Sequence, residues 1–221
     1  MKVGDVVYID YVGRIKDTNE IFDLTNEEIA KKEGIYNPNV TYKPIPVVVG
    51  FGFVIKGLDE ALQEMNVGEE KVIEIPPEKA FGKRDENLVK TFNLSDFKKQ
   101  DVDVKVGEYV SINGILGKVI SISGGRVMID FNHPLAGKTL VYNVKIVKKV
   151  EDEIEKVKAI LEFYFKDTSK FDVKEDKESD AIIIVDKEKI ISPENKKMLF
   201  DIISKIINKK RLIFMDIFEK K

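Results

Sequence analysis

The stretch Val47–Leu62, VVVGFGFVIKGLDEAL, runs from an apolar strand through a glycine turn into a short helix. A strand, G-x-G and a helix in this order also begin a dinucleotide-binding site, in which an acid such as Glu74 would bind the ribose. Such a site needs a third small residue three positions after Gly52, where helix and strand pack closely, and the sequence has Ile55 there. No Gly-Lys-Ser/Thr follows either, so the stretch is interpreted as a tight turn and not as a nucleotide site.

The composition narrows the classes of function. Among 221 residues, 43% are hydrophobic and 34% charged, which predicts a soluble globular chain. The 37 basic and 39 acidic residues nearly balance, so neither nucleic acid nor a membrane surface is an expected partner. There is no apolar run of membrane-spanning length and no signal-peptide pattern, which predicts a cytoplasmic protein. With no cysteine and the single histidine His133, neither a metal nor a cofactor is expected.

Apolar periodicity and turn residues predict the elements of the amino-terminal half. We expect a strand over residues 3–16, a loop over 17–46 with a short helix near 27–34, a strand from Val47, a helix over 57–65, a strand over 69–75 and a last strand over 138–148. Between these, residues 107–112, 117–122 and 126–131 read as β segments separated by Asn113-Gly114 and Gly124-Gly125. Glycine pairs of this kind are typical of hairpin turns, so the middle of the chain is predicted to be a β region of its own.

The pattern changes again after Glu151. Apolar residues at helical spacing predict an amphipathic helix over 151–166, and residues 181–185 read as a buried strand. Ser192-Pro193 is typical of a helix start, for a helix ending near Asn208, and residues 212–218 predict a final strand. Since the isoleucine stripe of this helix and the last strand are rich in apolar residues, we expect the α/β tail to be a small domain that forms a homodimer.

Local motifs for bond-breaking chemistry are lacking, because no nucleophile stands beside a base and no carboxylate pair is fixed in opposition. Asp23, Asp59 and Glu60 are interpreted as solvated surface residues, although such acids can converge in space. His133 is a candidate general base, but the favoured interpretation is a histidine that orients its loop through hydrogen bonds. The scattered aromatic residues, taken singly, are interpreted as core.

Six motifs in order along the chain resemble FKBP-type peptidyl-prolyl isomerases of the SlyD-like class. They are Asp10-Tyr11-Val12-Gly13, Phe22-Asp23, Lys43-Pro44-Ile45, the opening stretch as G-x-G-x-V-I-x-G-x-x-x-A-L, Pro76–Gly82 as P-x-x-A-Y-G, and His133–Tyr142 as H-P-L-A-G-x-x-L-x-F. Together they cover residues 1 to about 150.

The resemblance implies an α+β fold: an FKBP-like antiparallel sheet wrapped on a short helix, an inserted all-β flap domain, and a C-terminal α/β domain. The implied boundaries are 1–85 with 129–150 for the isomerase domain, 86–128 for the flap and 151–221 for the tail. The implied activity is prolyl isomerisation with chaperone binding of unfolded or nascent polypeptides that contain proline. The alternative left open is a holdase, a chaperone that binds without catalysis, with a vestigial proline pocket.

The resemblance also implies site residues. The catalytic set is Tyr11, Phe22, Asp23, Phe81 and Tyr142; the substrate-binding set is Ile45, Val54, Ile55, Leu58 and Leu135; the candidate client contacts of the flap are Val89, Phe92 and Phe97. Three positions depart from the family: Leu58 stands where many members have tryptophan, Phe81 lacks the usual tyrosine hydroxyl, and Tyr142 adds one. We expect the missing hydroxyl at Phe81 to weaken the binding of macrolide inhibitors more than it lowers proline turnover.

Overall fold

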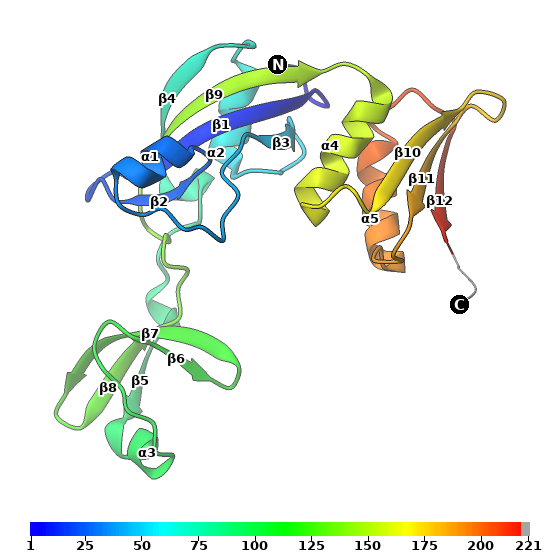
Figure 1. Cartoon of the computed structure of the whole chain (residues 1–221). Helices are drawn as coiled ribbons and strands as arrows, with labels where there is room; N and C mark the ends of the chain where they lie inside the picture. The colour runs from blue at the N-terminus through cyan, green and yellow to red at the C-terminus, as the bar shows by residue number, and fades with distance from the viewer. Residues whose placement is uncertain (218–221) are drawn as a thin grey trace. The chain divides into compact units, whose positions relative to one another are not determined.

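The computed structural model describes residues 1–217 (Figure 1). The chain divides into two compact units, one formed by Met1–Ile75 with Leu140 onward and one by Pro76–Thr139. The predicted flap limits, 86 and 128, fall inside the second unit, and the predicted tail groups with the first. The mixed α+β class is confirmed, and the division into three domains stays a prediction. No helix within residues 1–217 is long and apolar enough to cross a membrane.

The first unit is built on a five-stranded antiparallel sheet. Its strands run in the order β2 (Ile21–Leu24), β1 (Val6–Ile15), β9 (Leu140–Val150) and β4 (Glu70–Ile75), with β3 (Ile45–Val48) also paired to β1. Strands β1 and β9 pair from Val6 opposite Val150 to Ile15 opposite Leu140. The long strands agree with the sequence prediction, whereas β2 was missed because four residues are too few to show an alternating pattern.

Two helices accompany this sheet, α1 (Glu27–Lys32) and α2 (Lys56–Gln63). Figure 1 shows α2 lying across the sheet behind β1 and β9. Leu58 and Leu62 of α2 are 1% and 0% exposed, and the following Met65 is also fully buried. The apolar side of α2 therefore fills the core of the unit.

Asp59 explains the glycine turn in the opening stretch. Gly50 and Gly52 adopt φ values of 80° and 71°, which favour glycine. Their backbone N–H groups donate to the two carboxylate oxygens of Asp59, at 2.7 and 3.2 Å. Asp59 is 9% exposed, so the expectation of a solvated surface acid is wrong for this residue. Because the carboxylate occupies the N–H groups that a phosphate would use, the turn is closed to a nucleotide.

The second unit contains a four-stranded antiparallel sheet in the order β5 (Val89–Asn93), β8 (Arg126–Asp130), β7 (Ile115–Ser123) and β6 (Tyr109–Ile112). Its small core consists of the buried residues Val104, Val119, Val127 and Ile129. The unit also has two 3-10 turns, Pro77–Lys79 and Glu86–Leu88, and the helix α3 (Leu94–Lys99). The expectation of an all-β flap is therefore wrong in this respect. A six-residue helix is too short to show the apolar periodicity on which a sequence prediction depends.

The carboxyl-terminal part consists of α4 (Glu153–Phe165), β10 (Phe171–Asp176), β11 (Ala181–Asp186), α5 (Pro193–Ile203) and β12 (Arg211–Asp216). Strand β11 lies between an antiparallel β10 and a parallel β12, and both helices lie on one side of this sheet (Figure 1). Ser192 caps α5 as predicted, because its side chain accepts from the N–H of Asn195. The predicted last strand agrees as far as Asp216, and Phe218 lies outside the described residues.

Helix α4 also packs on the five-stranded sheet of the first unit. One buried cluster contains Val6, Val48 and Val150 from that sheet together with Ile160 and Leu161 from α4. The side chain of Tyr8 on β1 donates to Glu162 of α4 at 2.6 Å. The tail thus covers one face of the sheet beside β3, and its apolar surface is largely buried within its own chain.

Candidate functional site

Three aromatic side chains from three strands meet in the first unit. The ring of Tyr142 on β9 lies 5.6 Å, centroid to centroid, from both Tyr11 on β1 and Phe22 on β2. The Phe22 and Tyr142 planes are 78° apart, the edge-to-face arrangement that aromatic pairs favour. Tyr142 is 5% exposed, whereas Phe22 is partly exposed. The sheet therefore presents an aromatic surface with one buried member, Tyr142, and two partly exposed members, Tyr11 and Phe22.

Asp23 is the charged group at this surface. The hydroxyl of Tyr11 donates to Asp23 Oδ2 at 2.6 Å, and the Asp23 side chain is exposed. Burial raises the pKa of the Tyr11 hydroxyl above its ordinary value, and the Asp23 carboxylate raises it further. Burial likewise raises the pKa of Tyr142, with a smaller effect of Asp23. Both phenols thus remain neutral, so Tyr11 keeps the proton that it donates to the carboxylate.

Thr25 holds the tyrosine in place and was not identified from the sequence. The backbone N–H of Tyr11 donates to Thr25 Oγ1 at 2.8 Å, and the N–H of Thr25 donates to the carbonyl of Tyr11 at 3.0 Å. The Thr25 hydroxyl itself donates to Asp10 and is 6% exposed. The segment after β2 is thereby fixed to β1, which places Asp23 beside Tyr11. A threonine directly before the helix-capping Asn26 is an ordinary local pattern and gave no signal of this role.

Gly13 makes room for Phe22. A Cβ atom at residue 13 would lie 2.7 Å from Phe22 Cζ and 3.1 Å from Cε2. Gly13 is buried near the end of β1, directly opposite Tyr142 of β9. The ring of Phe22 therefore rests on the glycine backbone, which gives a physical reason for the glycine in the Tyr11–Gly13 motif.

Replacing Gly13 by alanine is expected to displace the Phe22 ring and to lower turnover about tenfold or more. The reason is that a contact of 2.7 Å cannot persist, and both the ring and the β1 backbone around it are packed. Turnover of a short proline peptide and thermal unfolding are the measurements. Phe22→Ala is the matched variant: in the double variant the turnover effects should be less than additive, whereas full additivity would contradict the displacement.

The predicted substrate-binding residues of the first unit lie on two segments. Ile45 begins β3 and is partly exposed, and Val54 and Ile55 lie at the start of α2, also partly exposed. Leu58 is 1% exposed and belongs to the core of the unit. Its contact with a proline ring stays a prediction.

Phe81 and Leu135 lie in the second unit. The ring of Phe81 stacks on His133, with centroids 4.3 Å apart and planes 2° apart. His133 Nδ1 accepts from the backbone N–H of Leu135 at 3.1 Å. The histidine therefore orients its loop through a hydrogen bond, as the favoured interpretation of the sequence had it, and its other face supports Phe81. That Phe81 and Leu135 close the proline pocket stays a prediction.

The second unit has a hollow of about 480 Å³. Phe92 and Phe97 line it, with ring centroids 6.2 Å apart, whereas Val89 is not among its lining residues. Tyr109 lies at the same hollow and is 48% exposed. Phe92 and Phe97 also pack on the small core, so two of the three candidate client contacts both line the hollow and belong to the packing of the unit.

The described part of the site offers apolar walls, neutral phenols and one carboxylate. Groups of these kinds can bind an apolar ring and act on the dipole of an amide. They fit a reaction in which no covalent bond is made or broken.

Comparison with known proteins agrees with this chemistry. The profile of FKBP-type peptidyl-prolyl cis-trans isomerases matches residues 1–147. A short-type peptidyl-prolyl cis-trans isomerase of Methanocaldococcus jannaschii is 39% identical over 155 residues, covering 69% of this chain and 98% of the relative. The FKBP-type isomerase SlyD of Treponema pallidum is 32% identical over 161 residues, covering 69% and 82%. SlyD of Helicobacter pylori is 27% identical over 124 residues, covering 54% and 67%.

Proposed function

Because the chain belongs to the FKBP-type peptidyl-prolyl cis-trans isomerase family, we propose that the aromatic surface of Tyr11, Phe22 and Tyr142 is its proline site. Ile45, Val54 and Ile55 would complete the wall on the same unit. The observation that carries this assignment is the convergence of Tyr11, Phe22 and Tyr142 around the Asp23 carboxylate.

The barrier to prolyl rotation is about 18–20 kcal/mol, because amide resonance must be broken. A twisted amide is less dipolar than a planar one. Moving the amide from water to an apolar wall therefore costs the planar ground state more than the twisted transition state, and the difference lowers the barrier. Edge and face contacts from Phe22 and Tyr142 would hold the pyrrolidine ring while the rest of the chain rotates.

Asp23 adds an electrostatic contribution. Its carboxylate is held by Tyr11 and does not need to reorganise when the substrate twists. A fixed negative charge beside the carbonyl carbon of the residue before proline favours the twisted amide, in which nitrogen no longer delocalises its electrons onto that carbonyl. Asp23 is thus proposed to act on the substrate directly, with Tyr11 as the positioning residue.

We further propose that the second unit binds unfolded polypeptides, so that the protein is an isomerase and a folding chaperone in the cytoplasm. The support is the hollow lined by Phe92 and Phe97, together with exposed apolar residues around it such as Tyr109 and Val102. Exposed apolar surface of this kind is typical of sites that bind protein chains. The clients would be unfolded or nascent chains that contain proline.

The experiment that tests both activities is refolding of a protein limited by prolyl isomerisation, with catalytic amounts of the whole chain. Acceleration of refolding supports the isomerase, and suppression of aggregation at equimolar amounts supports the chaperone. Suppression without any acceleration would favour the alternative, a holdase with a vestigial pocket.

The homodimer remains part of the proposal, with a changed physical basis. The isoleucine stripe predicted for the last helix is mostly covered, since Ile203 at the end of α5 is 0% exposed and Ile207, beyond the helix, is 8% exposed. Among the described residues, what stays open is the outer edge of β12 and the face of its sheet opposite the helices, where Met215 is 48% exposed. Edge strands of this kind pair readily with a second copy.

Light scattering at micromolar concentration is expected to give a mass twice that of the single chain, which is 25.2 kDa. Replacing Ile213 of β12 by lysine should shift the protein to the monomer, because the charge would enter the open face of the sheet. A lysine substitution at the exposed Val72 of β4 is the control. A monomeric parent protein would contradict the dimer.

A further inference from the structure

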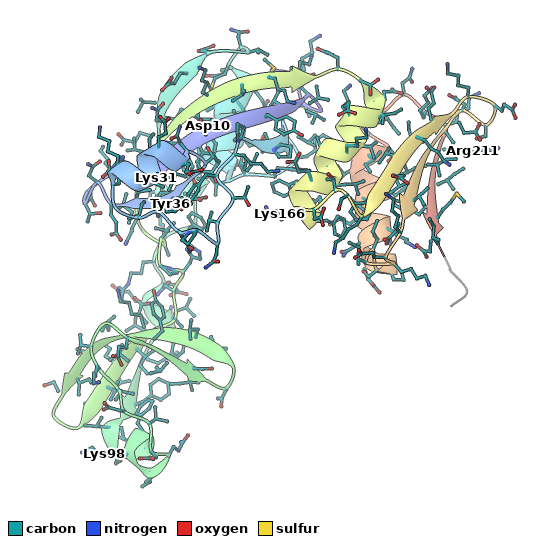
Figure 2. The ribbon with its side chains drawn as sticks, in the orientation of Figure 1. Asp10, Lys31, Tyr36, Lys98, Lys166 and Arg211 are labelled. Carbon is teal, nitrogen blue, oxygen red and sulfur yellow. The ribbon has the colours of Figure 1, made fainter. Side chains whose placement is uncertain are left out.

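A second hollow lies in the first unit, between the end of α4 and the segment that leads into β3. Its volume is about 470 Å³. One side is formed by Val40, Lys43 and Ile45, and the other by Phe163 and Lys166. Figure 2 shows Lys166 at the end of α4 that faces this segment. Val40 is 47% exposed, so an apolar wall of the hollow is accessible to a ligand.

This hollow shares one residue with the proposed proline site and is in contact with another of its segments. Ile45, one of the predicted substrate-binding residues, lines the hollow itself. Phe53, which directly precedes Val54, packs on Phe163 of α4 with ring centroids 4.5 Å apart. The segment bearing the wall of the proline site is thus in contact with the helix that forms the far side of the hollow. A chain whose proline ring rested against Val54 would therefore extend toward this hollow through the contact of Phe53 with Phe163.

The charged residues that line the hollow favour a negatively charged ligand. Lys43 forms an ion pair with Glu162, whose other carboxylate oxygen accepts from Tyr8 at 2.6 Å. These two opposite charges neutralise each other. Lys166 is exposed, and its ammonium lies 5.7 Å from the centroid of the Phe163 ring. The lining as a whole therefore carries a net positive charge beside an aromatic and an aliphatic side chain.

We propose that this hollow is a subsite for the substrate polypeptide, which takes an apolar side chain flanking the proline together with a neighbouring carboxylate. The apolar side chain would rest on Val40 and Phe163, and the carboxylate would face Lys166. The inference rests on the proposed location of the proline site and extends it: helix α4, outside the residues that the family profile matches, contributes to substrate selection.

The test uses exchange spectroscopy by NMR on the full chain, which gives kcat/KM for prolyl rotation without a coupling enzyme. One short peptide of four residues is compared with longer peptides that carry Leu-Asp or Leu-Lys either before or after the Xaa-Pro pair. We expect the Leu-Asp peptide to exceed the Leu-Lys peptide about three- to fivefold on one side of the proline, as for a partly exposed ion pair. The short peptide provides the baseline.

Lys166→Gln should abolish the preference for the Leu-Asp peptide over the Leu-Lys peptide. Val40→Ser should reduce the increase in kcat/KM that the leucine gives. Neither variant should change kcat/KM for the short peptide. Lys177→Gln is the matched control, since Lys177 is an exposed lysine in the turn between β10 and β11. An Asp preference that survives in Lys166→Gln, or equal turnover of all long peptides by the parent, would overturn the subsite. If Asp23→Ala left turnover of the short peptide unchanged, the proline site itself would be misassigned and the subsite with it.

Discussion

The Asp23→Ala variant is expected to lose about ten- to a hundredfold in kcat/KM for prolyl isomerisation. The loss corresponds to about 1.5–3 kcal/mol, the range for an interaction that involves a charged group. The folding stability should hardly change, because Asp23 is exposed and its hydrogen bond from Tyr11 lies at the surface. The parent protein and the Asp23→Ala variant are compared in three measurements. These are the refolding of a protein whose folding is limited by prolyl isomerisation, the turnover of a short proline peptide, and the thermal unfolding of the two chains themselves.

Tyr11→Phe separates the two roles that the geometry allows. If the carboxylate acts on the substrate and Tyr11 only positions it, this variant should lose less turnover than Asp23→Ala, and adding it to Asp23→Ala should have little further effect. Equal losses in both single variants would instead make the Tyr11 hydroxyl as important as the carboxylate. A large fall in melting temperature of Asp23→Ala with unchanged turnover would contradict the catalytic assignment.

The fold followed from the sequence where local pattern and tertiary environment agree. The opening stretch predicted the strand, turn and helix, and the position of Ile55 argued against a nucleotide site. The role of Asp59 could not be predicted from the sequence. Its carboxylate accepts hydrogen bonds from Gly50 and Gly52, which lie nine and seven positions away, and a single aspartate in a helix is usually solvated. Burial of a polar group is decided by tertiary packing, which a one-dimensional pattern does not contain.

Short elements were missed for a related reason. Strand β10 (Phe171–Asp176) carries three acidic residues and a lysine in six positions, so its apolar residues Phe171 and Val173 do not form a visible run. It becomes a strand because it pairs over its whole length with the strongly apolar β11. In this element tertiary pairing overrides local propensity.

The candidate site was predicted through the family resemblance and not through composition. Single aromatic residues such as Phe22 are most often core, and nothing in local spacing brings Phe22 and Tyr142 together across 120 positions of chain. The antiparallel register that places Gly13 opposite Tyr142 creates this contact. The hollow beside α4 was not predicted, because it depends on how the tail packs on the sheet.

The last prediction concerns the second unit and begins with the segments that enter and leave it. The N–H of Asp85 donates to Asn132 Oδ1 at 2.8 Å, and the side-chain amide of Asn132 donates to the carbonyl of Asp85 at 2.9 Å. Next to them, Arg84 Nε donates to Asp130 Oδ2 at 2.9 Å. The two segments are thus held together by contacts outside residues 86–128. Excision of 86–128 with a short glycine-serine link should leave this pairing intact.

The shortened chain is expected to lose suppression of aggregation and to bind an unfolded client at least about tenfold more weakly, because the hollow and its apolar surroundings are removed. Ile129 is 0% exposed in the whole chain, and the excision would expose its apolar side chain. It is therefore replaced by serine in the shortened chain. Turnover of a short proline peptide should change less than about threefold, since such a peptide needs no capture by a second site.

A point variant of the full chain removes the objection that excision disturbs the fold. Tyr109→Ser truncates an exposed residue of the hollow, and Val72→Ser truncates a residue of the first unit that is 68% exposed. Tyr109→Ser should weaken client binding several-fold while Val72→Ser leaves it unchanged, and neither should alter peptide turnover. If the shortened chain still suppressed aggregation like the parent, client binding would have to lie in the first unit, and the hollow of the second unit would be a feature of its own packing.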